Sequence, residues 1–195
     1  MAKPPVIQLK ILAFSSPEKW EAWLDRNHLH SNGIWLRFYK KASGKPSVTY
    51  AEALDLALCH GWIDSQVKSY DALSYLQRFS PRRARSVWSK VNTGHVERLI
   101  QAGRMKPAGQ RQIDAAKQDG RWAAAYASPR EAVLPEEFLK AVAKNRKAKA
   151  FLASLNRHNL YAIVHRLQTA QRPETRARRI RTFVTMLAKG EKFHP

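Results

Sequence analysis

The chain has 195 residues, of which 44% are apolar, so it can bury a sizeable core and global disorder is excluded as a description of the whole. It carries 35 Lys or Arg against 15 Asp or Glu, a formal net charge of +20. A charge of this size favours anionic partners: nucleic acid, an anionic lipid surface, or an acidic protein or metabolite.

The single cysteine and the amino-terminal residues bear on the compartment. Cys59 has no partner for an intrachain disulfide, and the apolar helical pattern around it indicates a buried, inert thiol. The first apolar run is broken by Gln8 and Lys10 and is followed by no small-residue cleavage site, so we expect no signal peptide. No run approaches the roughly 20 apolar residues of a transmembrane span. We therefore expect a cytoplasmic protein without a transmembrane segment.

The first predicted elements are a strand, a helix and a second strand. Residues 6–14 alternate loosely between apolar and polar side chains, which predicts a short strand or an extended arm. Ser-Pro-Glu at 16–18 is typical of a helix start, and apolar residues at helical spacing extend this helix to about Asn27. The aromatic and β-branched run Ile34–Lys40 predicts a strand.

Residues 49–79 predict a helix followed by a hairpin. Thr49 with Glu52 three residues later is the capping-box pattern, and the apolar stripe that follows ends at Gly61. Residues 62–70 and 73–79 then have the composition of two strands joined by a short turn. Together with the earlier strand they predict a small sheet that needs helices packed on it to be stable.

The remaining residues have the apolar spacing of helices. The predicted helices cover 93–103 and 107–120 and, beyond a linker at Ser128-Pro129, begin at Pro135, near Leu160 and at Pro173. The predicted fold class is therefore α+β, with a small antiparallel sheet packed with helices and an all-helical C-terminal region. We place the α+β domain at residues 1–128 and the helical domain at residues 130–195.

The segment 80–92 concentrates side chains that suit an anion. Arg82, Arg83 and Arg85 bring planar guanidiniums that match phosphate or carboxylate, and the next predicted helix presents its N-terminal N–H groups nearby. Tryptophans in this part of the chain offer a wall or a stacking surface. The predicted anion-binding residues are Arg82, Arg83, Ser86, Trp88, Ser89 and Asn92, together with Trp62 and with Asp64 orienting an arginine.

The same residues allow two other interpretations. In a purely structural one, the arginines pair with Asp64 and Asp71 and the tryptophans fill the core. In a catalytic one, His60 and Asp64 act with Ser65 or Cys59 as nucleophile. Because these side chains diverge across the predicted switch from helix to strand, we assign no catalytic residue.

No cofactor and no metal site are predicted. The seven histidines are scattered, without cysteine or carboxylates at ligand spacing. No glycine-rich phosphate-loop motif follows a predicted strand, so a nucleotide-cradling loop is not expected.

Residues 140–181 are the most basic part of the chain, with twelve Lys or Arg and a single acid, Glu174. Because apolar stripes face inward, the basic side chains lie outside, where they suit nucleic acid or an anionic membrane. An ordinary solvated face is the alternative, since no RRM, KH or zinc-finger motif accompanies the charge. The predicted nucleic-acid residues are Arg172, Arg176, Arg178, Arg179 and Arg181.

Three groups of residues resemble a bacterial family. They lie within residues 35–92 and 99–122, and the similarity resumes at 172–193, so it covers most of the chain. The groups are Gly61-Trp62-Ile63-Asp64, Pro81-Arg82-Arg83 with Ser86-x-Trp88-Ser89, and Gly103-Arg104-Met105 with Gly109. Together they resemble the YdeI/OmpD-associated family, which is named for bacteriocin protection.

The resemblance implies a role in resistance to cationic antimicrobial peptides or bacteriocins, and it supplies no catalytic residue. Because like charges repel, a chain of charge +20 is a poor direct trap for a cationic peptide, so the implied protection would be indirect.

We therefore predict a non-enzymatic, strongly basic binding protein of this family, whose Arg/Ser/Trp patch binds an anionic ligand or partner protein. The first alternative is a nucleic-acid-binding protein that uses the basic C-terminal helices. The second is a small-molecule enzyme with a cleft near Asp64.

Overall fold

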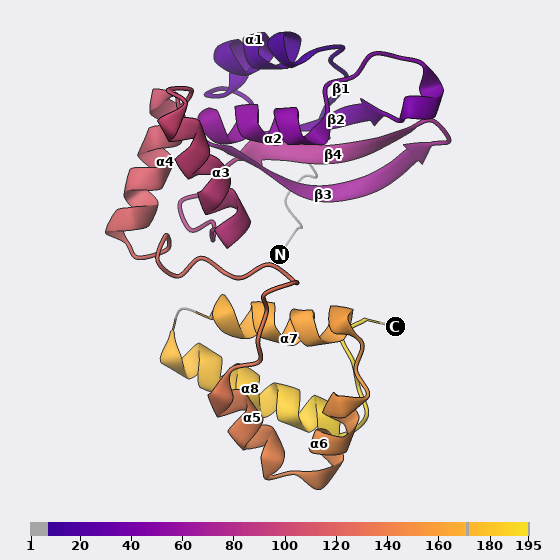
Figure 1. Cartoon of the computed structure of the whole chain (residues 1–195), viewed down its shortest axis with the longest axis vertical. Helices are drawn as coiled ribbons and strands as arrows, with labels where there is room; N and C mark the ends of the chain where they lie inside the picture. The colour runs from indigo at the N-terminus through magenta and orange to yellow at the C-terminus, as the bar shows by residue number, and fades with distance from the viewer. Residues whose placement is uncertain (1–7, 171, 195) are drawn as a thin grey trace, which may run out of the picture. The chain divides into compact units, whose positions relative to one another are not determined.

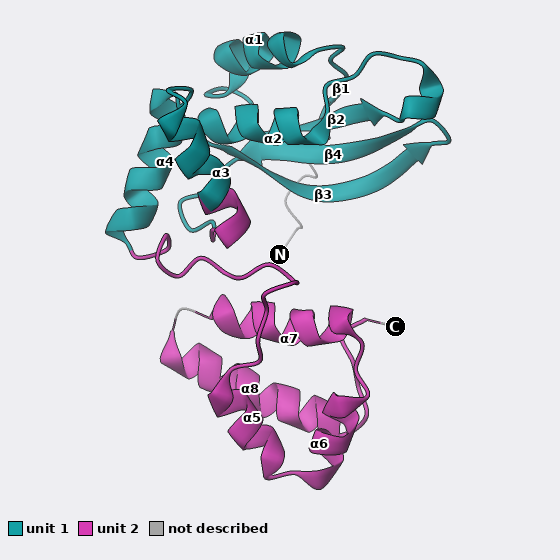
Figure 2. Ribbon diagram, viewed as in Figure 1, with its two compact units in different colours: residues 1–86, 94–119 teal, residues 87–93, 120–195 magenta. Residues whose placement is uncertain are grey.

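The computed structural model describes residues 8–170 and 172–194. They fold into two compact units, of which unit 1 comprises residues 8–86 and 94–119 and unit 2 comprises residues 87–93, 120–170 and 172–194 (Figure 2). The predicted division into 1–128 and 130–195 stays a prediction, because the two units interleave in sequence and do not meet at a single point. With one sheet and eight α-helices among the described residues, the fold class is α+β, as predicted.

Four strands form the sheet of unit 1, in the order β1-β2-β4-β3. Their bounds are β1 Ile11–Leu12, β2 Ile34–Tyr39, β3 Trp62–Asp71 and β4 Ser74–Pro81. The β3–β4 hairpin and the β2–β4 pair are antiparallel, as predicted for these three strands, whereas the edge strand β1 pairs parallel with β2. The chain leaves β1, crosses through a helix and returns to the same end of the sheet, which is the connection that a parallel pair requires.

The edge strand β1 is shorter than the predicted strand at 6–14, of which residues 6–7 lie outside the described residues. Beside it, the chain enters β2 through Gly33, which has a φ of +126°. A Cβ at this position would lie 2.7 Å from the backbone oxygen of Phe79, so only glycine allows β2 to start this close to β4.

The helices of unit 1 are α1 Pro17–Asn27, α2 Tyr50–Cys59, α4 Pro107–Gln118 and most of α3 Lys90–Gln101, and a 3-10 turn covers Lys41–Ser43. The predicted capping box of α2 is confirmed: the backbone N–H of Thr49 donates to Glu52 Oε2 (2.8 Å), and that of Glu52 donates to Thr49 Oγ1 (3.3 Å). The third helix begins at Lys90, three residues before the predicted start.

The core of unit 1 lies between α1, α2 and one face of the sheet (Figure 1). Alternate residues of β2 are buried, which is the period-2 pattern of a half-buried strand. Tryptophans fill much of this core, and their indole N–H groups find acceptors: that of Trp20 donates to Ala53 O and that of Trp62 to His28 O, each at 3.1 Å. No helix of unit 1 among the described residues covers the opposite face of the sheet (Figure 1).

Close backbone packing joins α4 to α2. A Cβ built on Gly109 would lie 2.4 Å from Cys59 O and 2.7 Å from Leu58 O, so a glycine is needed where α4 approaches the end of α2. This contact gives a structural reason for the glycine in the third group of family-like residues.

Unit 2 is built around the helices α5 Glu136–Ala143, α6 Arg146–Ala153, α7 Arg157–Gln168 and α8 Pro173–Ala188. Helix α6 was not predicted as a separate element. It is separated from α5 by Asn145, whose side chain caps the new helix by accepting from the backbone N–H of Ala148 (3.0 Å). The core includes Phe138, Ile163, Leu167 and Phe183. No helix in the described part of the chain has both the length and the apolar character needed to cross a membrane.

Candidate anion-binding site

An arginine-lined groove lies at the end of β4 in unit 1. It consists of two adjoining hollows of about 330 and 300 Å³ that share Arg78, Ser80, Pro81 and Arg83 as lining residues. The first hollow adds Asn32 and Arg82, and the second adds Ile63, Ser65, Gln66 and Ser86. We refer to both together as the arginine groove. No acidic residue is among its lining residues.

Strand alternation and two backbone hydrogen bonds position the groove. Arg78 and Ser80 are two residues apart on β4, so they point to the same face of the sheet. Just beyond the strand, the backbone N–H of Arg82 donates to Gly61 O (3.0 Å), which ties this segment to the start of β3. The groove is thus built on a strand and a short anchored turn, which hold its arginines close together.

The turn itself is closed by a side chain. The backbone N–H of Arg83 donates to Ser86 Oγ (3.0 Å), and Ser86 N donates back to Arg83 O (2.9 Å). The hydroxyl of Ser86 therefore has a structural role as an acceptor in this turn and also lines the groove.

Two of the groove's guanidiniums have no acidic partner. Within residues 8–170 and 172–194, no ion pair and no side-chain hydrogen bond involves the guanidinium of Arg78 or that of Arg83, and Arg78 Nε is buried without an acceptor. The third arginine, Arg82, is buried, with 6% of its surface exposed. The two guanidiniums without an acidic partner, those of Arg78 and Arg83, favour an anion at this place.

The structural alternative, in which these arginines pair with Asp64 and Asp71, does not hold. Asp71 pairs with Arg37 (2.6 Å). Asp64 Oδ2 accepts from Tyr50 Oη (2.8 Å) and Gln77 Nε2 (3.1 Å), so it does not orient an arginine as expected. The reason is the register of the hairpin.

Asp64 lies directly opposite Phe79 and so points to the helix-covered face, whereas Arg78 and Ser80 point to the other face. Trp62 shares the face of Asp64 and is 1% exposed within the aromatic core, with its ring packed edge-on against Trp23. It contributes to folding and is not a wall of the arginine groove.

The other predicted site residues belong to unit 2. Trp88 is buried against Trp122, with 5.0 Å between ring centroids. Ser89 Oγ accepts from the backbone N–H of Asn92 (3.1 Å), so this hydroxyl satisfies one of the N–H groups that were expected to face an anion. Of the predicted set, the arginine groove therefore brings together Arg82, Arg83 and Ser86.

Sequence reasoning missed Arg78 and Ser80. Both were included in or next to the predicted strand 73–79, and their positions two residues apart, beside Arg82, were the signal that could have found them.

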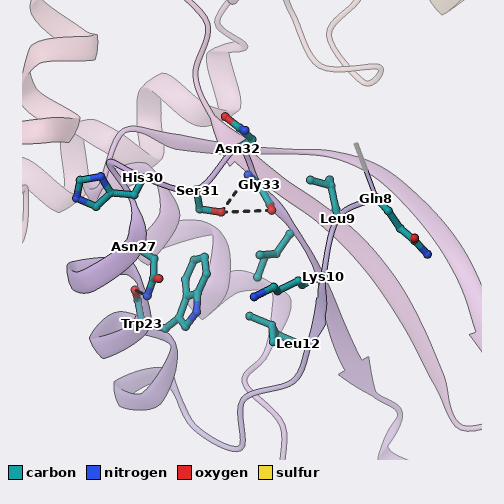
Figure 3. A pocket seen from close by; sticks show the side chains of 11 residues that line it. Gln8, Leu9, Lys10, Leu12, Trp23, Asn27, His30, Ser31, Asn32 and Gly33 are labelled. Carbon is teal, nitrogen blue, oxygen red and sulfur yellow. Dashed lines mark hydrogen bonds between the residues drawn. The ribbon is translucent and has the colours of Figure 1, made fainter. Parts of the chain in front are cut away.

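A pocket of about 390 Å³ in unit 1 lies between the end of α1, the segment around β1 and the start of β2 (Figure 3). Leu12, Trp23 and Ile34 form its apolar lining, and its charged or titratable residues are Lys10 and His30. Ser31 is held in the neighbouring turn, where its hydroxyl accepts from the backbone N–H of Gly33 (3.2 Å). The pocket lining contains no arginine, whereas three arginines line the arginine groove, so the groove is the stronger candidate for an anion.

The catalytic interpretation requires a cleft that contains His60 and Asp64. A hollow of about 110 Å³ is lined by His60, Trp62 and Arg82, among others, but not by Asp64. The ring nitrogens of His60 are both engaged: Nδ1 contacts Leu56 O (2.8 Å) and Nε2 contacts Asp25 Oδ1 (2.9 Å). Neither is free to accept a proton from a ligand in this hollow.

Cysteine and metal chemistry also lack support. Burial raises the pKa of the Cys59 thiol to about 11, so it stays protonated and unreactive, as expected for a buried thiol. Among the described residues, no group of three or more His, Cys, Asp or Glu could hold a metal ion.

The arginines predicted to contact nucleic acid in unit 2 divide into two groups. Arg176 pairs with Glu137 and donates from Nη1 to Leu167 O (2.6 Å), and Arg179 donates to Arg166 O. Their guanidiniums are used to hold the helices. The exposed members of the set are Arg172, Arg178 and Arg181.

Two family models match the chain. Residues 12–112 match the domain of unknown function DUF8412, and residues 131–190 match the model described as bacteriocin-protection, YdeI or OmpD-associated. The second match confirms the resemblance predicted from the sequence, and the groups of family-like residues at 61–64, 81–89 and 103–109 lie within the first. The comparisons with curated proteins and with solved structures found no match.

Proposed function

From the premise that the chain belongs to the DUF8412 family, whose model matches residues 12–112, and that residues 131–190 match the model described as bacteriocin-protection, YdeI or OmpD-associated, we propose that it binds a phosphate-bearing anion in the arginine groove. The proposal makes the chain a binding protein and assigns it no reaction.

One observation carries the proposal: three arginines line one groove whose lining contains no acid. A guanidinium presents its N–H groups as a planar fork that fits two phosphate oxygens, and it keeps its charge at every physiological pH. The hydroxyl of Ser80 adds a further donor on the same face. Hollows of about 330 and 300 Å³ are at the lower end of the range of small-ligand sites, large enough for a few phosphate groups.

A protective role would then act through an anionic partner. Direct capture of a cationic peptide is opposed by the repulsion between like charges, because the chain itself carries +20. Binding of a phosphate-bearing molecule faces no such barrier and is favoured by the same charge.

The test is calorimetric titration of the full chain with inorganic tripolyphosphate at low salt. We expect Arg78→Ala/Arg83→Ala to weaken binding by about tenfold or more, because each lost charge-assisted hydrogen bond contributes about 1.5–3 kcal/mol. The matched control is Arg26→Ala/Arg104→Ala, which removes the same charge from exposed positions outside the groove lining. It should leave the affinity within about twofold. Equal losses in the two double variants would show only a general attraction to a basic chain and would refute the proposal.

A further inference from the structure

We infer that the phosphate-bearing partner is a single-stranded nucleic acid, whose backbone lies in the arginine groove while its bases stack over the neighbouring face of the unit 1 sheet. The inference rests on the proposed function, since it assigns the partner class of the same site.

The face next to the groove carries aromatic and basic side chains in alternation with the core residues. Strand β2 directs Trp35, Arg37 and Tyr39 away from the buried Ile34, Leu36 and Phe38. In register, Trp35 lies opposite Arg78 and Arg37 lies opposite Leu76. The side chains on this face of β2 thus continue directly from the groove.

Positively charged side chains lie over the aromatic rings on this face. The Arg37 guanidinium lies over the rings of Tyr39 (4.6 Å) and Tyr70 (4.9 Å), and Lys68 Nζ lies over Trp35 (4.2 Å). Lys68 and Arg37 both lie opposite Leu76, which has no exposed surface. The result is a layer of alternating rings and positive charges over an apolar strand position.

Such a layer is suited to nucleic acid. Unpaired bases stack on aromatic rings regardless of sequence, and the cations beside the rings attract the phosphates. Cation–ring contacts at exposed sites are weak, so a base can replace the cation over a ring while that cation turns to a phosphate. Tyr70 is 49% exposed, so part of its ring is accessible to a base.

The dimensions and the charge agree with this partner. From Ser74 to Ser80 the strand β4 extends about 20 Å, which is enough for several nucleotides between the hairpin end and the groove. The acid on this face, Asp71, is paired with Arg37. A duplex hides its base faces, so its bases cannot stack on these rings.

The test is fluorescence anisotropy of the full chain with labelled oligo-dT and oligo-U of about 12 nucleotides at low salt. Tyr70→Ala and Tyr39→Leu/Tyr70→Ala should weaken oligonucleotide binding by about tenfold or more, since they remove stacking partners. The same variants should leave tripolyphosphate affinity within about twofold, because the groove is intact. Tyr161→Leu, a ring removal in unit 2, is the matched control and should leave both affinities unchanged.

A second readout does not depend on losing affinity. Stacking on Trp35 should quench part of the tryptophan fluorescence when oligonucleotide is added. Trp35→Phe should retain the affinity, because phenylalanine also stacks, and should lose that part of the quenching.

The outcomes separate the two proposals. If the tyrosine variants bind oligonucleotide as tightly as the unmodified chain, or if a duplex of equal length binds as well, the sheet-face inference is overturned while the groove stands. Loss of binding only in Arg172→Ala/Arg178→Ala/Arg181→Ala would assign nucleic acid to unit 2 and overturn it too. Binding to phosphatidylglycerol vesicles with no binding to oligonucleotide would replace the partner with a membrane. A chain that binds neither oligonucleotide nor tripolyphosphate would refute the proposed function itself.

Discussion

At the scale of single residues, the two faces of the sheet decide which polar side chains serve folding and which are available for binding. Asp64 and Arg78 come from adjacent strands, but the hairpin register turns them to opposite faces. The carboxylate is used by Tyr50 and Gln77, whereas the guanidinium meets no acid within the described residues. Residue type alone favours pairing between an aspartate and an arginine, and register keeps these two apart.

Asp64 should therefore matter for stability and not for binding. In Asp64→Ala, the amide of Gln77, which is buried, loses its carboxylate acceptor, and the chain should be destabilised by about 1–3 kcal/mol in urea unfolding. Tripolyphosphate affinity of the folded variant should stay within about twofold, with Arg78→Ala as the comparison that loses affinity. If Asp64→Ala binds as weakly as Arg78→Ala at full stability, Asp64 does orient the groove and our assignment of its role fails.

At the scale of elements, a partly buried carboxylate links two helices of unit 1. Asp55 on α2 accepts from Arg98 Nη2 (2.7 Å) and contacts His95 Nδ1 (2.8 Å), both on α3. Burial raises the pKa of Asp55, but the hydrogen bonds from Arg98 and His95 outweigh this and hold it below its ordinary value of 3.8. The helix pair is thus joined by a charge that acid can remove.

The lowered pKa of Asp55 predicts how the stability of the fold depends on pH. Because the folded pKa of Asp55 is depressed, its stabilisation is complete above the unfolded pKa of 3.8 and is lost as pH falls through the lower folded value. At neutral pH, Asp55→Asn should be less stable than the unmodified chain by about 1–3 kcal/mol. The difference should shrink in urea unfolding series carried below about pH 4. A difference that stays constant down to about pH 2 would show that the carboxylate charge does not stabilise the contact.

At the scale of the whole molecule, the charge of +20 is a background against which a specific site must be distinguished. A general positive field attracts any polyanion and is screened by salt, whereas a site contacts a defined number of phosphates. Unit 2 illustrates the difference, since two of its five predicted contact arginines are used within the unit itself. The number of basic residues in the sequence is therefore larger than the number whose charge is available to bind a partner.

Salt dependence measures how many phosphates the site engages. If the three arginines of the groove contact about three phosphates, the slope of log K against log salt for oligo-dT should be about −2. Arg78→Ala should make it shallower by about 0.7, and Arg26→Ala should leave it unchanged. A slope several times steeper, equally affected by both variants, would mean that the whole basic surface binds and that no local site exists.

Most of the elements, and the similarity of the C-terminal helices to the YdeI/OmpD-associated family, could be predicted from the sequence, because they depend on local patterns. The capping box at Thr49, the strand at 34–40 and the helices beginning at Pro107 and Pro173 follow from spacing and capping chemistry along the chain. The arginines at 82 and 83 were recognised for the same reason, as a short basic cluster after a strand. The helix α6 was missed because the apolar spacing of a helix continues past Asn145. Only the side chain of Asn145, which caps the new helix, marks the boundary between α5 and α6.

The site and the partner assigned to it depended on the tertiary structure, since they require knowing which face each strand residue occupies and which acid meets which cation. Sequence spacing could not show that Asp64 turns toward α2, that Arg78 joins Arg82 and Arg83, or that Trp62 belongs to the core. The parallel pairing of β1 likewise depends on a crossover through α1. Local patterns are encoded within a few residues, whereas a binding surface is formed by strand register between segments far apart in the chain.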